Sequence, residues 1–496
     1  MGSCSEQRRL KAESVCVIGA GPSGLAAAKY LLAERAFSRI SILEQRSTVG
    51  GLWNYVPCPN NVLAGLRIPQ ANPHAKRNEP IWTGDLNSSN GLQQTQATFM
   101  TPVYDRLETN IPRGLMRFSD LEWPEDCQLF PEHEKVLEYI ERFADDVRHL
   151  VKFQTQVLDV RLLVDKRWAV KSQVLNPTGN GVISEEIFDA VIVASGHFDV
   201  EHIPDVPGIR EWNAAYPRSI SHSKYYRSPE PYANKKVIVV GNSASGIDIS
   251  AQIQPICKHP LLLSQKSESF LVNETSASKI DKPPIAEYVV ENRTVKFADG
   301  TIERDVDAIL YCTGYFYSLP FLDSLSPSLI TAGERVENLY QHIFYRPQPT
   351  LSFLVLNQRV IPFPIAEAQS AIIARSLSGK ISLPGEEEMK SWEEALIQEM
   401  GAGRDFHVLK YPKDANYINM LHDWAVTSDG KIPDRHPDNT LTGRPPPYWG
   451  EEEFWIRARF PQIKKAFNDM GDMRHSKRSL IDVGFDFDAW SRENTL

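Results

Sequence analysis

The sequence lacks three features that would each point to a different class of protein. Its six cysteines form no C-x-x-C pair and show no zinc-ligand spacing, so we expect no disulfide framework, no redox cysteine pair and no metal site. Lys and Arg number 54 against 63 Asp and Glu, a net charge of −9, so no nucleic-acid partner is expected. No run of 18 apolar residues occurs, so no membrane partner is expected, and we predict a cytoplasmic protein with reduced thiols.

What is present is typical of a large folded protein. The chain has 496 residues, of which 42% are hydrophobic and 24% charged. This length predicts two or three domain-sized units rather than a small binding module.

A glycine-rich turn near the start of the chain predicts a dinucleotide site. Residues 19–24 read G-x-G-x-x-G between a predicted strand at 14–19 and a predicted helix at 23–35, and a second strand is predicted at 39–44. Such glycines allow a tight turn and let a pyrophosphate approach the helix N-terminus. Glu44 ends the second strand, where a carboxylate accepts hydrogen bonds from ribose hydroxyls, although a solvated strand end is the alternative. With the glycine pair that follows, the residues predicted to bind this dinucleotide are Gly19, Gly21, Pro22, Ser23, Gly24, Glu44, Gly51, Leu52 and Trp53, the last of which could instead belong to the core.

The same strand–turn–helix pattern returns at residues 236–266. Its turn, 241–246, keeps the first and last glycines but has Ser243 in the middle position, and Ser245 lies in the same turn. Glu44 lies 25 residues after Gly19, and Lys266 lies 25 residues after Gly241. Because an acid suits a free 2′-hydroxyl and a cation suits a 2′-phosphate, the first site predicts FAD and the second NADPH. The alternative for Lys266 is an ordinary solvated lysine.

Several further segments resemble the flavin-containing monooxygenase family, and most closely its soluble fungal branch. Residues 216–226 resemble the fingerprint F-x-G-x-x-x-H-x-x-x-Y, with His222 and Tyr226 kept but Tyr216 and Arg218 in place of Phe and Gly. Residues 104–113 are similar to the family segment L-x-T-N-x-P, residues 311–315 to A-T-G-Y, and residues 359–369 to the segment that returns to the FAD domain.

The resemblance implies a class B flavoprotein monooxygenase. NADPH would reduce FAD, O2 would form a hydroperoxide at flavin carbon 4a, and its outer oxygen would pass to a soft nitrogen or sulfur nucleophile of a small molecule. A nitrogen-containing natural product is the substrate class that we expect. Asn110 would be the catalytic residue beside the flavin, or else a turn residue. The resemblance adds Thr109, Thr313 and Gly314 as cofactor-binding residues, and His222 as a hinge or NADPH contact.

The expected architecture is α/β, with two Rossmann-like dinucleotide-binding domains. The FAD-binding domain would comprise residues 1–212 and 325–496, and the NADPH-binding domain, residues 213–324, would be inserted in it. Helices are predicted at 132–150, 366–377, 386–400 and 416–426, and a long surface loop at 57–97. The proline-started helix near residue 366 either points its N-terminus at the flavin or is an ordinary helix.

Two other functions stay open on the sequence alone. A Baeyer–Villiger oxygenase has a similar plan, but its fingerprint ends in Trp or Pro where Tyr226 stands. A non-catalytic module that binds FAD or NADPH is suggested by the altered Tyr216 and Arg218. A homodimer is allowed, and residues 401–449 have no assigned role.

Overall fold

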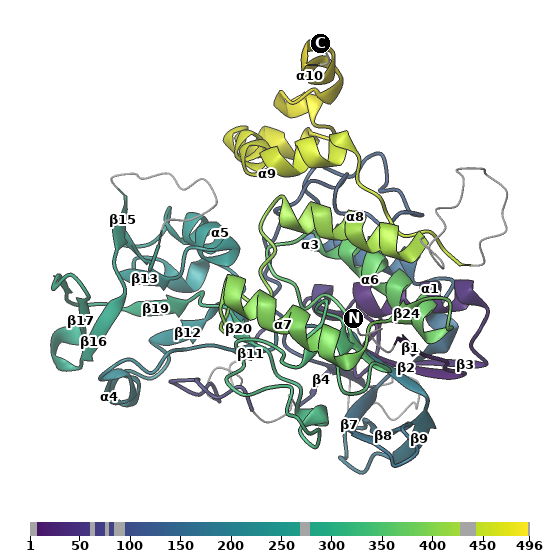
Figure 1. Ribbon diagram of the computed structural model, residues 1–496. Helices are drawn as coiled ribbons and strands as arrows, with labels where there is room; N and C mark the ends of the chain where they lie inside the picture. Colours follow the sequence, from purple (N-terminus) through teal and green to yellow (C-terminus); the bar gives the residue numbers. More distant parts are fainter. Residues whose placement is uncertain are drawn as a thin grey trace, which may run out of the picture.

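The computed structural model describes residues 7–59, 65–74, 79–83, 95–267, 278–426 and 443–494. Two separate sheets organise the chain, each with a helix against it, and C-terminal helices pack beyond them (Figure 1). The second sheet is wholly parallel, and the first is parallel except at one edge, where two strand pairings are antiparallel. The first sheet takes strands from residues 14–193 and 339–353, whereas the second takes all its strands from residues 220–311.

The first sheet has seven strands, and β2 (Ser14–Ile18) lies inside it, paired in parallel with β3 on one side and β10 on the other. Val15 and Val17 face one hydrophobic core, and Cys16 and Ile18 face another. Such a run without polar alternation is what a parallel strand covered on both faces requires. Each fully buried valine contributes about 1.5–3 kcal/mol. In spatial order the strands are β21 (Leu339–Tyr340), β22 (Phe344–Tyr345), β23 (Leu351–Phe353), β10 (Ala190–Val193), β2, β3 (Arg39–Leu43) and β6 (Val151–Lys152).

Two helices lie against each other on one face of this sheet. Helix α1 (Pro22–Glu34) packs on α6 (Pro362–Leu377), which is buried along almost its whole length. On the other face lies an antiparallel three-stranded sheet formed by β7 (Thr155–Leu162), β8 (Trp168–Val174) and β9 (Ile183–Phe188). The sequence placed the start of α6 four residues too late, because its two prolines occupy the first turn, where their missing N–H groups cost nothing.

The second sheet has five strands in the order β12 (Ile220–His222), β19 (Ala308–Tyr311), β13 (Val237–Val240), β14 (Leu261–Ser264) and β15 (Lys279–Lys282). Helix α5 (Ala244–Ile253) covers one face through Ile249 and Ile253. The other face packs against α4 (Ile209–Ala215) and an antiparallel sheet of β16 (Ile285–Val289), β17 (Thr294–Phe297) and β18 (Ile302–Glu303). The domain boundaries at 212/213 and 324/325 stay predictions, although all strands of this sheet fall between them.

The remaining elements correct several sequence expectations. Helix α3 (His133–Phe143) ends seven residues before the predicted end, because the chain turns at Ala144 into a short 3-10 segment at Arg148–Leu150. The expected loop at 57–97 contains β4 (Ile81–Thr83) and β5 (Gln96–Thr98), and its residues 60–64, 75–78 and 84–94 lie outside the described residues. The other short pairs are β1 (Arg8–Arg9) with β24 (Ser382–Leu383) and β11 (Val200–Glu201) with β20 (Tyr315–Phe316).

Helices α7 (Glu386–Met400) and α8 (Lys413–Val426) lie where helices were predicted. A further helix of 19 residues, α9 (Glu451–Asp469), was missed, because Pro461 stands inside it and argues against a helix. It is followed by the 3-10 segment Gly471–Ser476 and by α10 (Phe487–Asn494), at the top of Figure 1. Among the described residues, no helix combines the length and the apolar character needed to cross a membrane.

Candidate flavin and nicotinamide sites

The first glycine turn joins β2 to α1 and depends on two of its three glycines for packing. Gly19 has φ +106°, and a Cβ there would lie 2.6 Å from the carbonyl oxygen of Ala194 at the end of β10. A Cβ on Gly24 would lie 1.9 Å from the carbonyl oxygen of Gly19. Both positions therefore exclude any side chain, since backbone atoms occupy the space.

The middle glycine, Gly21, faces a different neighbour. A Cβ on Gly51, which has φ +57°, would lie 3.0 Å from the Cα of Gly21, so the segment Gly51–Trp53 lies directly against the turn. Gly21 is the N-cap of α1, so no side chain caps this helix, and its first turn contains no acidic residue. Its free N–H groups and the glycine backbones around them form a cradle that suits a pyrophosphate.

Glu44 is buried and holds this turn in place. One carboxylate oxygen accepts a hydrogen bond from the Ala20 amide at 2.7 Å, and the other accepts one from the Arg46 amide at 2.8 Å. A carboxylate has about four acceptor positions, so capacity for ribose hydroxyls remains. Among the described residues, the buried Nε of Arg46 has no hydrogen-bond partner, which leaves a donor for a bound ligand beside the predicted site. These residues fit a flavin dinucleotide.

The second turn repeats this geometry closely. Gly241 has φ +107°, and a Cβ there would lie 2.6 Å from the carbonyl oxygen of Cys312 at the end of β19. A Cβ on Gly246 would lie 1.9 Å from the carbonyl oxygen of Gly241. Ser243, the N-cap of α5, and Ser245 are exposed, and no side chain caps this helix either.

Lys266 is exposed just after β14, at the same edge of the sheet as this turn. It lies close enough to His202 to act with Arg404 in lowering the pKa of that imidazole, which burial and these charges bring to about 4. Arg404 donates a hydrogen bond to the carbonyl oxygen of Thr313 at 3.2 Å. Arg404 was not predicted as a site residue, since it falls in the stretch 401–449, to which no role was assigned.

The predicted residues Thr313 and Gly314 form a loop tied to two histidines. The Thr313 hydroxyl donates to the carbonyl oxygen of His202, and the His202 amide donates to the carbonyl oxygen of Gly314 at 3.0 Å. His222 is fully buried: its Nδ1 accepts from the Lys224 amide at 3.2 Å, so its Nε2 carries the proton donated to Gly314 at 3.1 Å. Burial lowers the pKa of His222 to about 3, and the ring stays neutral. Of the two predicted roles, this geometry favours the hinge.

The structure shows the surroundings of the two altered fingerprint positions, Tyr216 and Arg218. Arg218 has φ +68°, the left-handed conformation that glycine adopts freely, so the family's glycine suits the backbone here and arginine carries strain. The hydroxyl of Tyr216 donates to the carbonyl oxygen of Val290 at 2.7 Å. Tyr226 donates to Gln252 on α5 at 3.1 Å. The fingerprint residues thus bond to elements packed against the second sheet, α5 and the chain after β16.

Asn110 differs from these residues because its side-chain amide has no hydrogen-bond partner among the described residues. It is half-buried, and its side chain makes no hydrogen bond to any residue that the structure describes. Its neighbour Thr109 is buried, with its hydroxyl donating to the carbonyl oxygen of Ile111 at 2.9 Å and its amide to that of Pro131 at 2.9 Å. The backbone on either side is therefore fixed, while the Asn110 amide can still donate to and accept from a ligand.

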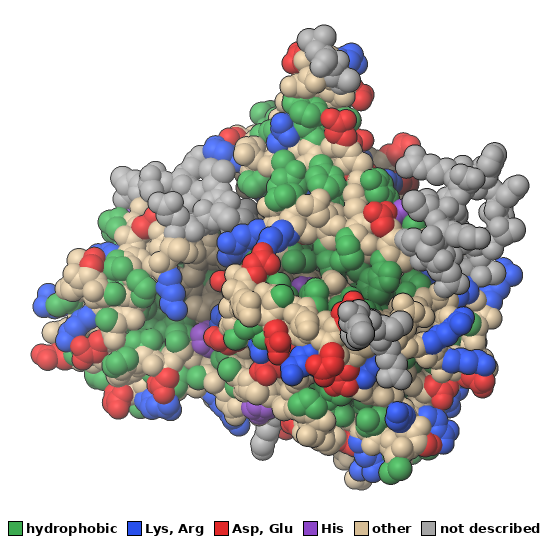
Figure 2. All heavy atoms as spheres, viewed as in Figure 1, with side chains coloured by type: hydrophobic (Ala, Val, Ile, Leu, Met, Phe, Trp, Pro, Cys, Tyr) green, Lys and Arg blue, Asp and Glu red, His purple; other side chains and the backbone are tan. Residues whose placement is uncertain are grey.

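Figure 2 shows acidic and basic side chains interspersed over the visible face, with no broad basic area among its described residues. Two turns of the same geometry, each at the carboxyl ends of the parallel strands of its own sheet, define a two-domain dinucleotide-binding protein of the flavoprotein type.

Comparisons with known proteins agree with this class. Residues 83–281 and 279–434 match the model described as flavin-binding monooxygenase-like, and residues 17–68 match an NAD(P)-binding Rossmann-like domain. The chain belongs to the flavin-binding monooxygenase-like family. It is an enzyme that uses a flavin and a nicotinamide cofactor, which confirms the predicted family, fold class and enzyme class.

Relatives of this family cover most of the chain. The flavin-containing monooxygenase FMO GS-OX-like 9 of Arabidopsis thaliana is 33% identical over 439 residues, 85% of this chain and 88% of that protein. The flavin-containing monooxygenase ustF2 of Aspergillus flavus is 29% identical over 460 residues, 84% of this chain and 92% of that protein. The solved structure of S-allyl-L-cysteine S-oxygenase from Allium sativum has a TM-score of 0.72 at 27% identity, covering 98% of this chain and 99% of that one.

Proposed function

We propose that the protein is an NADPH- and FAD-dependent monooxygenase that transfers one atom of O2 to a soft nitrogen or sulfur nucleophile of a small molecule. The observation that carries the cofactor assignment is the pair of matched turns, with buried Glu44 after the first and exposed Lys266 after the second. An acid suits the ribose of FAD, and a cation suits the 2′-phosphate that distinguishes NADPH from NADH.

The flavin, when bound and reduced, supplies the oxygen-activating chemistry, and the side chains have supporting tasks. The cradle of Gly19, Gly21 and Gly51 would hold the pyrophosphate. Asn110 would hydrogen-bond the reacting part of the flavin and exclude water there. No side chain needs to act as a nucleophile.

The substrate class is supported by the relatives. One is an S-oxygenase that acts on S-allyl-L-cysteine, so a thioether is the first substrate to test. A nitrogen-containing natural product, the substrate class expected from the resemblance to the fungal branch of the family, is the second. A cytoplasmic location and a homodimer stay predictions, which cell fractionation and light scattering would test.

The experiment is a turnover assay of the purified protein with one thioether, one tertiary amine and one cyclic ketone. NADPH consumption, hydrogen peroxide and oxygenated product are measured together. Product from the thioether or the amine, with NADPH preferred over NADH, supports the proposal. Lactone from the ketone alone would favour a Baeyer–Villiger oxygenase. Bound flavin without any product would favour a non-catalytic module.

A further inference from the structure

The segment that carries Asn110 crosses between the two units of the molecule. The first unit is the part built on the first sheet, and the second unit is the part built on the second sheet. At its beginning, residues 104–106 bond to the second unit: the Tyr104 hydroxyl contacts the Asp248 carboxylate on α5, and the Asp105 amide donates to the carbonyl oxygen of Arg227 at 2.9 Å. The next residues bond to the first unit. Glu108 pairs with Glu132 in an isolated antiparallel bridge just before α3.

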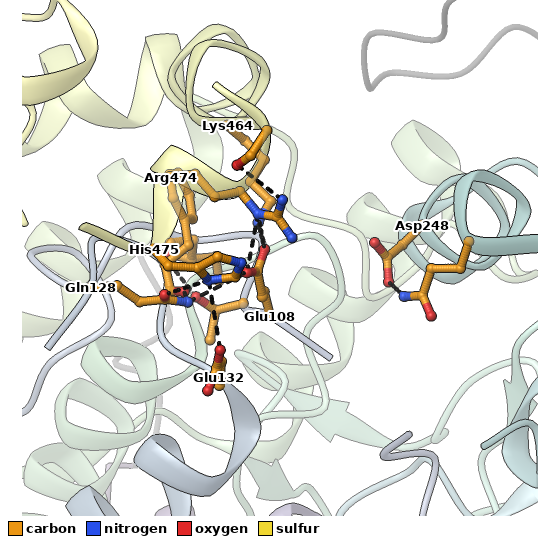
Figure 3. A network of polar contacts seen from close by, with 12 residues as sticks. Glu108, Gln128, Glu132, Asp248, Lys464, Arg474 and His475 are labelled. Carbon is orange, nitrogen blue, oxygen red and sulfur yellow. Dashed lines mark hydrogen bonds and ion pairs between the residues drawn. The ribbon is translucent and has the colours of Figure 1, made fainter. Parts of the chain in front are cut away.

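The side chain of Glu108, two residues before Asn110, points toward the C-terminal segment (Figure 3). Its carboxylate oxygens lie 3.5 Å from Nζ of Lys464 on α9 and 3.3 Å from Nε of Arg474 in the following 3-10 segment. Nδ1 of His475 lies 3.6 Å away. The side chains of Glu108 and Lys464 are each only 13% exposed, so solvent screens this pair poorly.

The Lys464 ammonium also contacts two aromatic rings. It lies 4.5 Å from the ring centroid of Phe130 and 5.1 Å from that of Phe467. Burial lowers the pKa of Lys464, and the charge of Glu108 opposes this shift. Removing one partner of such a buried pair leaves the other charge uncompensated, which costs far more than loss of a surface pair.

The same cluster could be read as a metal site, because ligand atoms of Glu108, Glu132 and His475 lie within 4.8 Å of one another. However, Lys464 and Arg474 already supply positive charge to Glu108. A metal ion would meet repulsion from both, so the cluster is an ion-pair clamp.

We infer that this clamp positions Asn110: by holding Glu108, Lys464 and Arg474 fix the stretch of backbone from which the Asn110 amide reaches the flavin. The inference rests on the proposed role of Asn110. It makes Lys464 and Arg474 positioning residues that act from the C-terminal segment without touching the cofactor.

The first test replaces Lys464 with Met, which keeps the length of the stem and removes the charge. Lys464→Met is expected to bind flavin and to keep its KM for NADPH, while product per NADPH falls about tenfold and peroxide rises, since a small misplacement of a reacting group is that costly. The matched control is Lys465→Met, because the neighbouring Lys465 forms an i,i+4 pair with Asp469 at the surface. The control should behave as the parent enzyme.

A second pair of variants addresses the case in which Lys464→Met does not fold. The Arg474 side chain is more exposed, at 28%, so Arg474→Gln is less disruptive. Arg474→Gln should uncouple NADPH oxidation from product formation, and Arg474→Lys should restore much of the coupling. A role in stability alone predicts a lower unfolding temperature with unchanged peroxide yield.

Asn110→Ala separates this inference from the proposed function. If Asn110→Ala uncouples the enzyme but neither clamp variant does, the clamp is refuted and the role of Asn110 stands. If none of the variants uncouples it, the role of Asn110 falls and the clamp falls with it. Support for the clamp requires that Asn110→Ala and one clamp variant, Lys464→Met or Arg474→Gln, each uncouple and that their combined effect is smaller than the product of the two.

Discussion

The two glycine turns of the molecule are almost identical where they pack and different where a ligand would lie. Gly19 and Gly241 have φ +106° and +107°, and Gly24 and Gly246 each exclude a Cβ by the same 1.9 Å approach to backbone oxygen. The middle position, however, is Gly21 in one and Ser243 in the other. The outer glycines therefore allow the close packing of strand and helix, whereas the middle position does not take part in that packing.

In the first turn a second segment, Gly51–Trp53, lies against the middle position. A Cβ on Gly51 would lie 3.0 Å from the Cα of Gly21, which is a tight contact, whereas a Cβ on Gly21 would lie 3.5 Å from the Cα of Gly51, an ordinary van der Waals distance. The side chain of Ser243 is exposed, and there a serine is tolerated. The residues after the second strand differ in the same sense: Glu44 is buried and bonded to its own turn, and Lys266 is exposed and available to a ligand.

The largest effect is expected when a side chain is placed at the last glycine of each turn, where helix and strand meet most closely. Gly24→Val should abolish flavin binding, because α1 must move away from Gly19, at a cost of about 1–3 kcal/mol or more. Gly246→Val should leave the flavin bound but prevent its reduction by NADPH. Flavin absorbance of the purified proteins and the rate of anaerobic reduction measure the two effects.

The control for both is Gly114→Ala, since Gly114 has no atom within 4 Å of an added Cβ. A Gly24→Val protein that keeps a full complement of flavin would show that the first turn does not hold it.

The second prediction asks whether oxygen chemistry belongs to the first unit alone. Asn110→Ala should leave flavin binding and reduction intact, lower product formation on the order of a hundredfold, and raise peroxide, as expected when a donor to developing charge is removed. The matched control is Asn176→Ala, because the side chain of Asn176 only caps a turn at Thr178. Equal coupling in the two variants would make Asn110 a turn residue as well.

A third prediction sharpens the contrast between Glu44 and Lys266. Lys266→Glu should weaken NADPH binding by roughly 1–3 kcal/mol and leave NADH binding nearly unchanged, because only NADPH carries the 2′-phosphate. Lys258→Glu is the control, since Lys258 is exposed before the opposite end of the same strand. The KM values for both cofactors measure the effect. Equal losses for NADPH and NADH would move the phosphate site to another cation, with Arg404 the first to test.

The smallest expected effect concerns the other position where the second unit lacks a family glycine. Arg218→Gly should stabilise the fold by up to about 1 kcal/mol, because left-handed backbone strain is relieved and part of the gain is lost to chain entropy. Arg218→Ala keeps the strain and should bring no gain. Thermal unfolding of both variants decides, and a stabilised alanine variant would mean that the arginine side chain itself was unfavourable.

The sequence predicted the parts of the molecule whose pattern is local. Both strand–turn–helix units were predicted near their observed bounds, because uninterrupted apolar strands followed by glycine turns have few other uses. Helix α9 was missed, since Pro461 opposes a helix locally while Trp455, Ile463 and Phe467 stabilise it through tertiary packing. Arg404 and the ion pairs of Glu108 were also missed, because their partners lie far away in the sequence and no short motif records them.

In the sequence, the strands of the second sheet lie between two groups of strands of the first sheet, and this order has a consequence for synthesis. The second sheet has all its strands once residue 311 has been made, but the first needs β23, which ends at Phe353, to cover β10. At roughly 5–20 residues per second, the ribosome needs a few more seconds to supply that strand. Limited proteolysis of ribosome-stalled chains of increasing length would follow this order. The turn that emerges first from the ribosome thus belongs to the sheet that is completed last, and under the proposed cofactor assignment the nicotinamide site is complete before the flavin site.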